Sequence, residues 1–341
     1  MTDQPTTQMR RSAAQRHVSR ALWYVGPGQV ELKIASLPPL GPGEARVRTQ
    51  YSGISRGTER LILSGSVPQA EFARMRAPLQ EGDFPFPVKY GYCAAGLVED
   101  GPPELQGKPV FCLHPHQDVF NAPAAMLVPL PDGLTTRRAT LAANMETALN
   151  ALWDSGAGPG DRIVIVGAGI LGLLVAALAA KIPGTDTTIV DTLPERAALA
   201  VSLGAAFALP HAAPTDADVV IHTSASAPGF NTAIGCAGLE ATIIELSWYG
   251  EKAIHASLGG AFHSRRLRLI SSQVGHVAPS RRPRWSYRRR LEKALVLLQD
   301  PRLDALVADD IAFDDLPARL PPVLTGSPAT LPPVIRYTLS L

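Results

Sequence analysis

A strand, glycine loop, helix and second strand between residues 161 and 191 constrain the fold of this chain more than any other stretch. The apolar run at 163–166 is typical of a strand buried on both faces, and it stops at a glycine. Residues 167–172 read GAGILG, which matches G-x-G-x-x-G, and an apolar helix-forming segment follows at 173–180. A second apolar strand is expected at 187–190. The stretch therefore predicts a βαβ unit that binds a dinucleotide.

Each residue of this pattern has a physical task. Gly167 permits a tight turn, Gly169 lets the backbone approach a pyrophosphate, and Gly172 lets the helix pack close to the sheet. Asp191, which ends the second strand, can accept hydrogen bonds from ribose hydroxyls and would repel a 2′-phosphate, so the pattern favours NAD over NADP. Arg196 is expected to face solvent. The candidate cofactor-binding residues here are Gly167, Gly169, Ile170, Leu171, Gly172 and Asp191.

Composition excludes several other classes of protein. The 341 residues are 46% hydrophobic and carry a formal net charge of only +2, which does not suggest nucleic acid or an acidic membrane as the main partner. Three widely spaced cysteines form no C-x-x-C, so we expect no disulfide framework and a cytoplasmic location. The basic run 281–290 is interpreted as a solvated helix start, with an anionic ligand or nucleic acid as the alternatives.

The rest of the chain predicts two domains. Short strand-like pieces with glycine and proline turns fill the first part, including expected strands at 45–51, 93–98 and 109–112, while residues 60–90 are expected to be irregular. Further strands at 217–222, 241–246 and 267–272 alternate with helices and predict a doubly wound parallel sheet, an α/β Rossmann fold. We expect a tail at 1–17, a β-rich domain at 18–140 and 300–341, and a Rossmann domain at 141–299.

Three motifs in this layout resemble the medium-chain dehydrogenase/reductase superfamily. Gly53-Ile54-Ser55-Arg56 stands where its alcohol dehydrogenases carry Gly-Ile-Cys-Arg, Gly91-Tyr92-Cys93 stands for Gly-His-Glu, and Gly160-Asp161 leads into the glycine loop. The string from Ser52 to Glu59 is most similar to the bacteriochlorophyllide dehydrogenase branch. The resemblance implies a GroES-like catalytic domain beside the Rossmann domain, hydride transfer with NAD, and a small-molecule substrate. A homodimer and an anionic substrate are further expectations.

The departures from the superfamily concern its catalytic zinc. The positions of the three zinc ligands correspond to Ser55, Tyr92 and about Ala143, and none of these suits zinc, which prefers thiolate, imidazole or carboxylate. We therefore expect a zinc-independent member with no metal ligands. A site rebuilt from Cys93, Cys112, His114 and His116 is the alternative, although no ligand spacing supports it.

Without zinc, a side chain must transfer the hydroxyl proton. Tyr92 is the first candidate, followed by Ser55, Glu146 and His116, and each has a purely structural alternative. By the same resemblance Thr147 would touch the nicotinamide ring and Arg56 would meet a cofactor phosphate. We expect an NAD(H)-linked oxidoreductase that interconverts an alcohol and a ketone or aldehyde. The alternatives are a non-catalytic NAD(H)-binding sensor and a bacteriochlorophyllide-type hydroxyethyl dehydrogenase.

Overall fold

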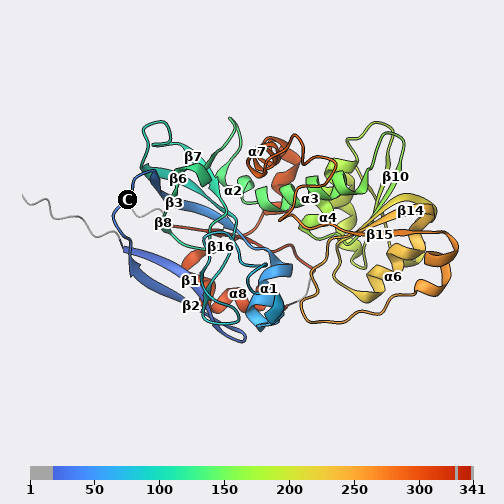
Figure 1. Cartoon of the computed structure of the whole chain (residues 1–341), viewed down its shortest axis with the longest axis horizontal. Coiled ribbons are helices and arrows are strands. Elements are labelled where there is room, and N and C mark those ends of the chain that lie inside the picture. Colours follow the sequence, from blue (N-terminus) through green and yellow to red (C-terminus); the bar gives the residue numbers. More distant parts are fainter. Residues whose placement is uncertain (1–17, 327–328, 339–341) are drawn as a thin grey trace, which may run out of the picture.

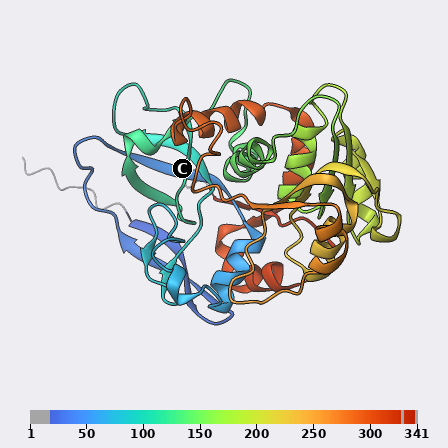
Figure 2. The same ribbon diagram turned by 45° about the vertical axis from the view of Figure 1, so that its right-hand side comes forward.

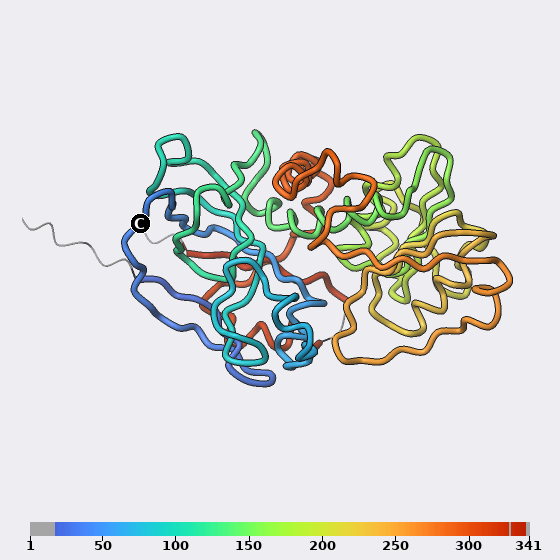
Figure 3. Tube along the Cα trace, in the orientation of Figure 1, coloured from blue at the N-terminus to red at the C-terminus, as the bar shows by residue number. Residues whose placement is uncertain are grey.

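The computed structural model describes residues 18–326 and 329–338, which form two lobes (Figure 1). Strands from the first part of the chain fill one lobe, and the strands between residues 162 and 271 fill the other. The chain enters the second lobe through the helices at 136–155 and returns after residue 300, as the green and red parts of the trace show (Figure 3). The predicted tail at 1–17 lies outside the described residues.

The second lobe is built on a six-stranded sheet in which every neighbouring pair is parallel. Its order is β12-β11-β10-β13-β14-β15, so the chain reverses direction along the sheet between β10 and β13. This arrangement confirms the predicted doubly wound Rossmann sheet. The strands are β10 (Arg162–Val166), β11 (Asp186–Val190), β12 (Ala206–Ala208), β13 (Ala217–His222), β14 (Ala237–Glu245) and β15 (Arg268–Ser271).

Both faces of this sheet are covered by helices. Ile163 and Ile165 of β10 belong to the apolar core shared with α3 (Ala142–Ser155), α4 (Ile170–Ala179), α5 (Ala197–Ser202) and α7 (Tyr287–Leu297). Val164 and Val166 point the other way, into the core shared with α6 (Ala227–Cys236). Because successive side chains of a strand alternate between faces, two helical layers require an uninterrupted apolar strand. Figure 2 shows these helices on both sides of the sheet.

The first lobe contains two sheets, one of four strands and one of seven. One has the order β2-β1-β5-β4, and the other has the order β16-β17-β3-β6-β7-β9, with β8 paired to β3. Their strands are β1 (Val18–Gly26), β2 (Gln29–Ser36), β3 (Glu44–Gly53), β4 (Glu81–Gly82), β5 (Val88–Lys89), β6 (Ala94–Asp100), β7 (Pro109–Cys112), β8 (Val119–Pro123), β9 (Val128–Pro129), β16 (Asp310–Ala312) and β17 (Val334–Arg336). The β-rich GroES-like character predicted for this part is consistent with these sheets.

The end of the chain joins the first lobe. β17 pairs antiparallel with β3, with Ile335 opposite Ser52, and α8 (Leu316–Thr325) packs against β2 and α1 (Arg56–Ser64). The domain boundaries at residues 140 and 300 stay predictions. Within the described part of the chain, no helix is both long and apolar enough to cross a membrane.

α1 corrects the expectation that residues 60–90 are irregular throughout. The helix starts after Ser55 and ends at Gly65, whose left-handed conformation (φ 67°) suits glycine. Ile62 and Leu63 of this helix are buried in the core of the first lobe. The helix was missed because its apolar positions are few, although a serine before it and a glycine after it are typical boundary residues.

A buried ion pair joins α3 to α7. Arg290 donates from Nε to Glu146 Oε1 at 2.8 Å and from Nη1 to Asn150 Oδ1 at 2.6 Å, and the arginine is only 2% exposed. Burial raises the pKa of Glu146, and the Arg290 cation opposes this without reversing it. Arg290 therefore does not belong to a solvated face, contrary to the interpretation of the basic run at this position.

Removing one partner of this pair leaves the other buried and unpaired. We expect Arg290→Met to lower the free energy of unfolding by about 3–5 kcal/mol. Arg266→Ala is the matched control, because the Arg266–Glu240 pair is exposed and should contribute less than about 1 kcal/mol. Urea unfolding of both variants measures the difference, and equal losses would contradict the structural role of Arg290.

Candidate active site

The predicted glycine loop connects β10 to α4 and can be occupied only by glycine at two positions. Gly167 has φ +115°, and a Cβ atom there would lie 2.6 Å from Thr223 Oγ1. A Cβ atom at Gly172 would lie 1.9 Å from the Gly167 carbonyl oxygen. These contacts explain the first and third glycines of the motif by packing alone.

The second glycine has a different reason. Gly169 precedes the first residue of α4 and is exposed, and a Cβ atom there would meet nothing within 4 Å. The space beside it lies at a helix N-terminus, where free N–H groups and the helix dipole favour a phosphate. Ile170 and Leu171 begin the helix and pack partly against the core. The loop therefore fits a dinucleotide pyrophosphate.

Asp191 is tied to this loop by hydrogen bonds. Its Oδ2 accepts from the Ala168 N–H at 2.5 Å, and its Oδ1 accepts from the Leu193 N–H at 2.9 Å. Arg196 is 7% exposed, so the expectation that it faces solvent is wrong; burial lowers the pKa of Arg196, while Asp191 acts in the opposite direction. Asp191 remains half-buried at the sheet edge, where ribose hydroxyls can reach it.

In the first lobe a buried network surrounds Glu59. The carboxylate accepts from Tyr24 Oη at 2.8 Å and from the Ser55 N–H at 2.7 Å, and His116 Nε2 lies 3.2 Å from Oε2. The other imidazole nitrogen, His116 Nδ1, lies 2.8 Å from Ser52 Oγ. Burial raises the pKa of Glu59, but His116, the Ser55 N–H and Tyr24 outweigh it and the net pKa is lowered.

Tyr92 is half-buried and packs against two apolar clusters, one built from first-lobe residues and one that includes residues of both lobes. Its hydroxyl is 3.3 Å from Thr58 Oγ1 on the first turn of α1. Burial raises the pKa of Tyr92, with Cys93 adding to the effect and hydrogen bonds from Ser55 and Thr58 opposing it. Such a phenol can donate a hydrogen bond but is a poor proton acceptor near neutral pH.

Tyr92 and Ser55 thus both lie near the start of α1. Ser55 and His116 both contact the carboxylate of Glu59. Glu146 instead lies in the α3–α7 contact with Arg290. His114, the other histidine of the pair at 114–116, stacks on Phe120 with ring centroids 3.7 Å apart, and burial lowers its pKa to about 3.

The two further residues assigned to cofactor binding are placed as follows. Thr147 donates to the Ala143 carbonyl oxygen within α3 at 2.9 Å. Arg56 donates to the carbonyl oxygens of Val323 and Thr330, each at 3.0 Å. Burial lowers the pKa of Arg56, and the nearby Arg196 cation adds to this, so the two arginines approach one another across the lobes.

A cavity of about 330 Å³ lies between the lobes. It is lined by Arg60, Leu61 and Ser66 from the first lobe and by Ala225, Trp248, Tyr249, Glu251 and Lys252 from the second. Gly250 forms part of the seam, because a Cβ atom there would lie 2.5 Å from the Ser66 carbonyl oxygen. The cavity borders the carboxyl end of the parallel sheet, where ligands bind in folds of this type.

The residues present do not fit a catalytic zinc. Among residues 18–326 and 329–338, no group of three or more His, Cys, Asp or Glu side chains gathers in a way that could hold a metal ion. Cys93 and Cys112 are buried, and burial raises the pKa of Cys112 to about 12.

Sequence reasoning missed His222 and Glu245. They end the neighbouring strands β13 and β14 in direct register, and they sit beside the cavity residues Ala225 and Tyr249. The available signal was a polar residue at or next to the end of two expected strands, His222 in 217–222 and Glu245 in 241–246.

Known proteins that are similar to this chain in sequence include dehydrogenases. A 2-desacetyl-2-hydroxyethyl bacteriochlorophyllide A dehydrogenase of Rhodobacter capsulatus is 28% identical over 311 residues, which is 85% of this chain and 93% of that protein. An uncharacterized zinc-type alcohol dehydrogenase-like protein of Haemophilus influenzae is 42% identical, but the match spans only about a quarter of either protein. No protein-family model matches the chain.

Solved structures extend the likeness to the whole fold. A dehydrogenase of Sinorhizobium meliloti bound to NADP superimposes with a TM-score of 0.74 at 18% identity, covering 94% of this chain and 99% of that one. The chain has the medium-chain dehydrogenase/reductase fold. A short chain alcohol dehydrogenase from Escherichia coli CFT073, complexed with NADH, gives 0.73 at 13% identity with 94% and 99% covered. Together with the sequence relatives, these likenesses support an alcohol dehydrogenase-like oxidoreductase of that superfamily.

The glycine loop makes a prediction about stability. Gly172→Ala forces a methyl group against the Gly167 carbonyl oxygen and should lower the free energy of unfolding by about 1–3 kcal/mol. Gly169→Ala places its methyl group in open space and should change stability by less than about 1 kcal/mol. Thermal and urea unfolding compare the two variants. A Gly169→Ala protein as unstable as Gly172→Ala would contradict the described loop.

Proposed function

We propose that this protein is a zinc-independent, NAD(H)-linked oxidoreductase that interconverts an alcohol and a ketone or aldehyde. The observation that carries the proposal is the glycine loop, with open space at Gly169, in a protein that also has an interlobe cavity and, among its described residues, no group of metal ligands. A bound nicotinamide would supply the hydride acceptor or donor. The chain's own residues must then bind the substrate and manage its hydroxyl proton.

Asp191 supports NAD as the preferred cofactor. Its two hydrogen bonds to backbone N–H groups fix the carboxylate at the end of β11, where a 2′-phosphate would meet a negative charge. One structural neighbour was solved with NADP and another with NADH, so the fold accommodates either cofactor. Arg196 lies beside Asp191 and is the residue through which NADP could still be accepted.

Tyr92 is proposed to polarise the substrate carbonyl. Its high pKa keeps the phenol protonated, so it donates a hydrogen bond to a carbonyl or alkoxide oxygen at the lobe junction. Ser55 and Thr58 orient this hydroxyl.

The cavity favours a substrate with an anionic group. Arg60 and Lys252 line it, against the single carboxylate of Glu251. The second candidate is a hydroxyethyl dehydrogenase acting on a bacteriochlorophyllide, since the relative of that name matches nearly along its whole length.

Two measurements test the proposal as a whole. An enzyme should consume NADH in the presence of at least one carbonyl compound from a panel that includes keto acids, simple ketones and aldehydes, whereas a sensor would bind NADH with a fluorescence change and no turnover. Metal analysis of the purified protein should find no stoichiometric zinc. Stoichiometric zinc required for turnover would remove the zinc-independent part and leave the oxidoreductase part standing.

Cofactor preference should follow the charge at position 191. We expect Asp191→Ser to raise NADPH affinity at least tenfold, about 1.4 kcal/mol, because the repulsion of the 2′-phosphate is gone. Glu195→Ser is the control, since Glu195 is an exposed carboxylate four residues away. Fluorescence titration gives both constants. Tighter binding of NADPH than NADH by the unchanged protein would show that Asp191 does not select the cofactor.

The role of Tyr92 is tested by removing only its hydroxyl. Tyr92→Phe should lower kcat about a hundredfold or more and leave NADH affinity within a few-fold. Tyr90→Phe is the control, because the Tyr90 ring lies 6.0 Å from that of Tyr92 and is buried in the same region. A Tyr92→Phe enzyme that works within a few-fold of the parent would make Tyr92 a residue that only fills space.

A further inference from the structure

A second group of titratable side chains lies at the carboxyl edge of the parallel sheet. His222 ends β13 and Glu245 ends β14, and the two residues face each other in the strand register. Asp191 ends β11 on the opposite side of the reversal between β10 and β13. A dinucleotide crosses such a sheet at the reversal, with the adenosine on one side and the reactive half on the other. His222 and Glu245 therefore lie on the reactive side.

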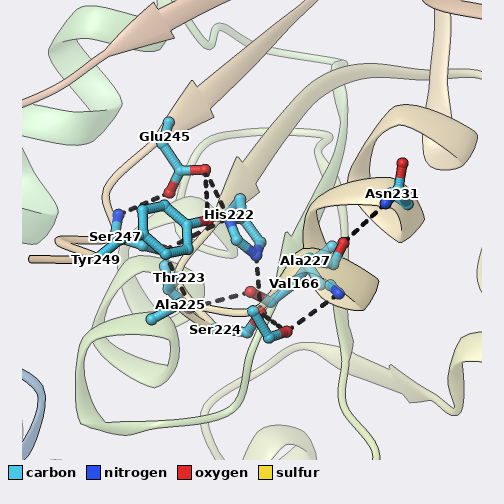
Figure 4. Close-up of polar contacts among 12 residues, drawn as sticks. Val166, His222, Thr223, Ser224, Ala225, Ala227, Asn231, Glu245, Ser247 and Tyr249 are labelled. Carbon is cyan, nitrogen blue, oxygen red and sulfur yellow. Dashed lines mark hydrogen bonds and ion pairs between the residues drawn. The ribbon is translucent and has the colours of Figure 1, made fainter. Parts of the chain in front are cut away.

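The three side chains of this group form a directed chain of hydrogen bonds (Figure 4). His222 Nδ1 lies 2.8 Å from Glu245 Oε2, and His222 Nε2 lies 2.7 Å from Ser224 Oγ. An ionised carboxylate only accepts, so Nδ1 carries the hydrogen and Nε2 accepts from the Ser224 hydroxyl. His222 is fully buried, whereas Ser224 is only half-buried. Glu245 is half-buried as well, so both ends of the chain of hydrogen bonds are partly exposed, and Ser224 is the end that carries a transferable hydroxyl proton. Ser224 Oγ also lies 3.0 Å from Ser226 Oγ.

Glu245 is held as a carboxylate by its surroundings. It accepts from the Ser247 N–H at 2.7 Å and from Tyr249 Oη at 3.2 Å. Burial raises the pKa of Glu245, but hydrogen bonds from His222 and Ser247 outweigh it and the net pKa is lowered. The titratable groups that contact the His222 imidazole are Glu245 and Tyr249. From α6, the Phe230 ring lies 5.7 Å from the imidazole ring.

The backbone around Ser224 is shaped to hold this arrangement. Ala225 has φ +50°, a strained backbone conformation for a non-glycine residue, and its N–H donates to Ser247 Oγ at 3.0 Å. Position 229 on α6 suits only glycine, because a Cβ atom there would lie 2.1 Å from Ser224 Oγ. Ala225 also lines the interlobe cavity. The strained turn thus presents Ser224 beside the cavity.

We propose that Ser224 and His222 carry the substrate proton, with Glu245 as a positioning residue; this rests on the proposed oxidoreductase function. In alcohol oxidation the substrate C–H bond breaks as its hydride leaves to the nicotinamide, and the O–H proton passes to Ser224 Oγ. The proton of Ser224 moves at the same time to His222 Nε2, and Glu245 stabilises the imidazolium. Ketone reduction runs the same transfers in reverse. Tyr92 then donates a hydrogen bond but takes no proton.

Ser224→Ala and Tyr92→Phe separate these two roles through their pH profiles. Neutral imidazole accepts the proton in oxidation and imidazolium returns it in reduction, so parent kcat for oxidation should rise with pH and kcat for reduction should fall. Ser224→Ala should lose about a hundredfold in kcat together with this pH dependence. Tyr92→Phe should lower kcat at every pH and keep the same profile. NADH affinity, measured by fluorescence, should stay within a few-fold in both variants.

A readout without turnover tests the histidine itself. In protein labelled with 15N-histidine and free of cofactor, the His222 signals are those lost in His222→Gln. We expect a hydrogen on Nδ1 and none on Nε2 of the neutral imidazole. Glu245→Gln replaces the carboxylate with an amide, which can donate as well as accept, and should weaken this preference for one tautomer. If His222→Gln fails to fold, the imidazole signals that change in both Glu245→Gln and Ser224→Ala identify His222, because it contacts both residues.

The outcomes distinguish this relay from the proposed function. If the parent turns over and Ser224→Ala keeps its kcat within threefold with the same pH profile, the relay is wrong and the oxidoreductase stands. The relay is equally overturned if the neutral His222 imidazole carries its hydrogen on Nε2, because that nitrogen could then accept no proton. If the parent binds NADH but consumes none with any carbonyl compound of the panel, the proposed function fails and the relay fails with it.

Discussion

The geometry of the first lobe depends on one buried charge, the carboxylate of Glu59. A carboxylate that is 1% exposed is tolerable only when donors replace the water it has lost, and Tyr24, His116 and the Ser55 N–H do so. These donors come from β1, from the segment after β7 and from the start of α1. One side chain therefore joins three parts of the lobe that are far apart in the sequence. A negative charge in the first turn also suits the dipole of α1.

The position of α1 in turn shapes the cavity. Once Glu59 fixes the first turn, the next residues of the helix, Arg60 and Leu61, form the wall that faces the second lobe. The opposite wall is brought close by Gly250, whose lack of a side chain allows contact with the backbone of Ser66. The interlobe cavity is thus a product of packing on both sides, and a change in either lobe would alter its width.

Much of the fold could be predicted from the sequence, because local patterns specify it. The β10–α4–β11 unit follows from alternating burial and three glycines, and β13 was placed at its observed residues. What could not be predicted depends on distant pairing. His222 and Glu245 are 23 residues apart and meet only through the parallel register, and Arg290 and Glu146 are 144 residues apart. Periodicity contains no information on which polar residue faces which across strands or helices.

Residues 18–326 and 329–338 contain two histidine–glutamate pairs, and these pairs differ in exposure. His116 and Glu59 are both buried, and the hydroxyl beyond His116, that of Ser52, is also buried and hydrogen-bonded to Tyr337. A proton on that imidazole has no described route to a ligand, so the pair holds the lobe together. In the second pair the hydroxyl beyond His222 belongs to half-buried Ser224, next to a cavity residue. Of the two pairs, the second is therefore the one to which the proposed proton relay is assigned, because it adjoins a residue of the interlobe cavity.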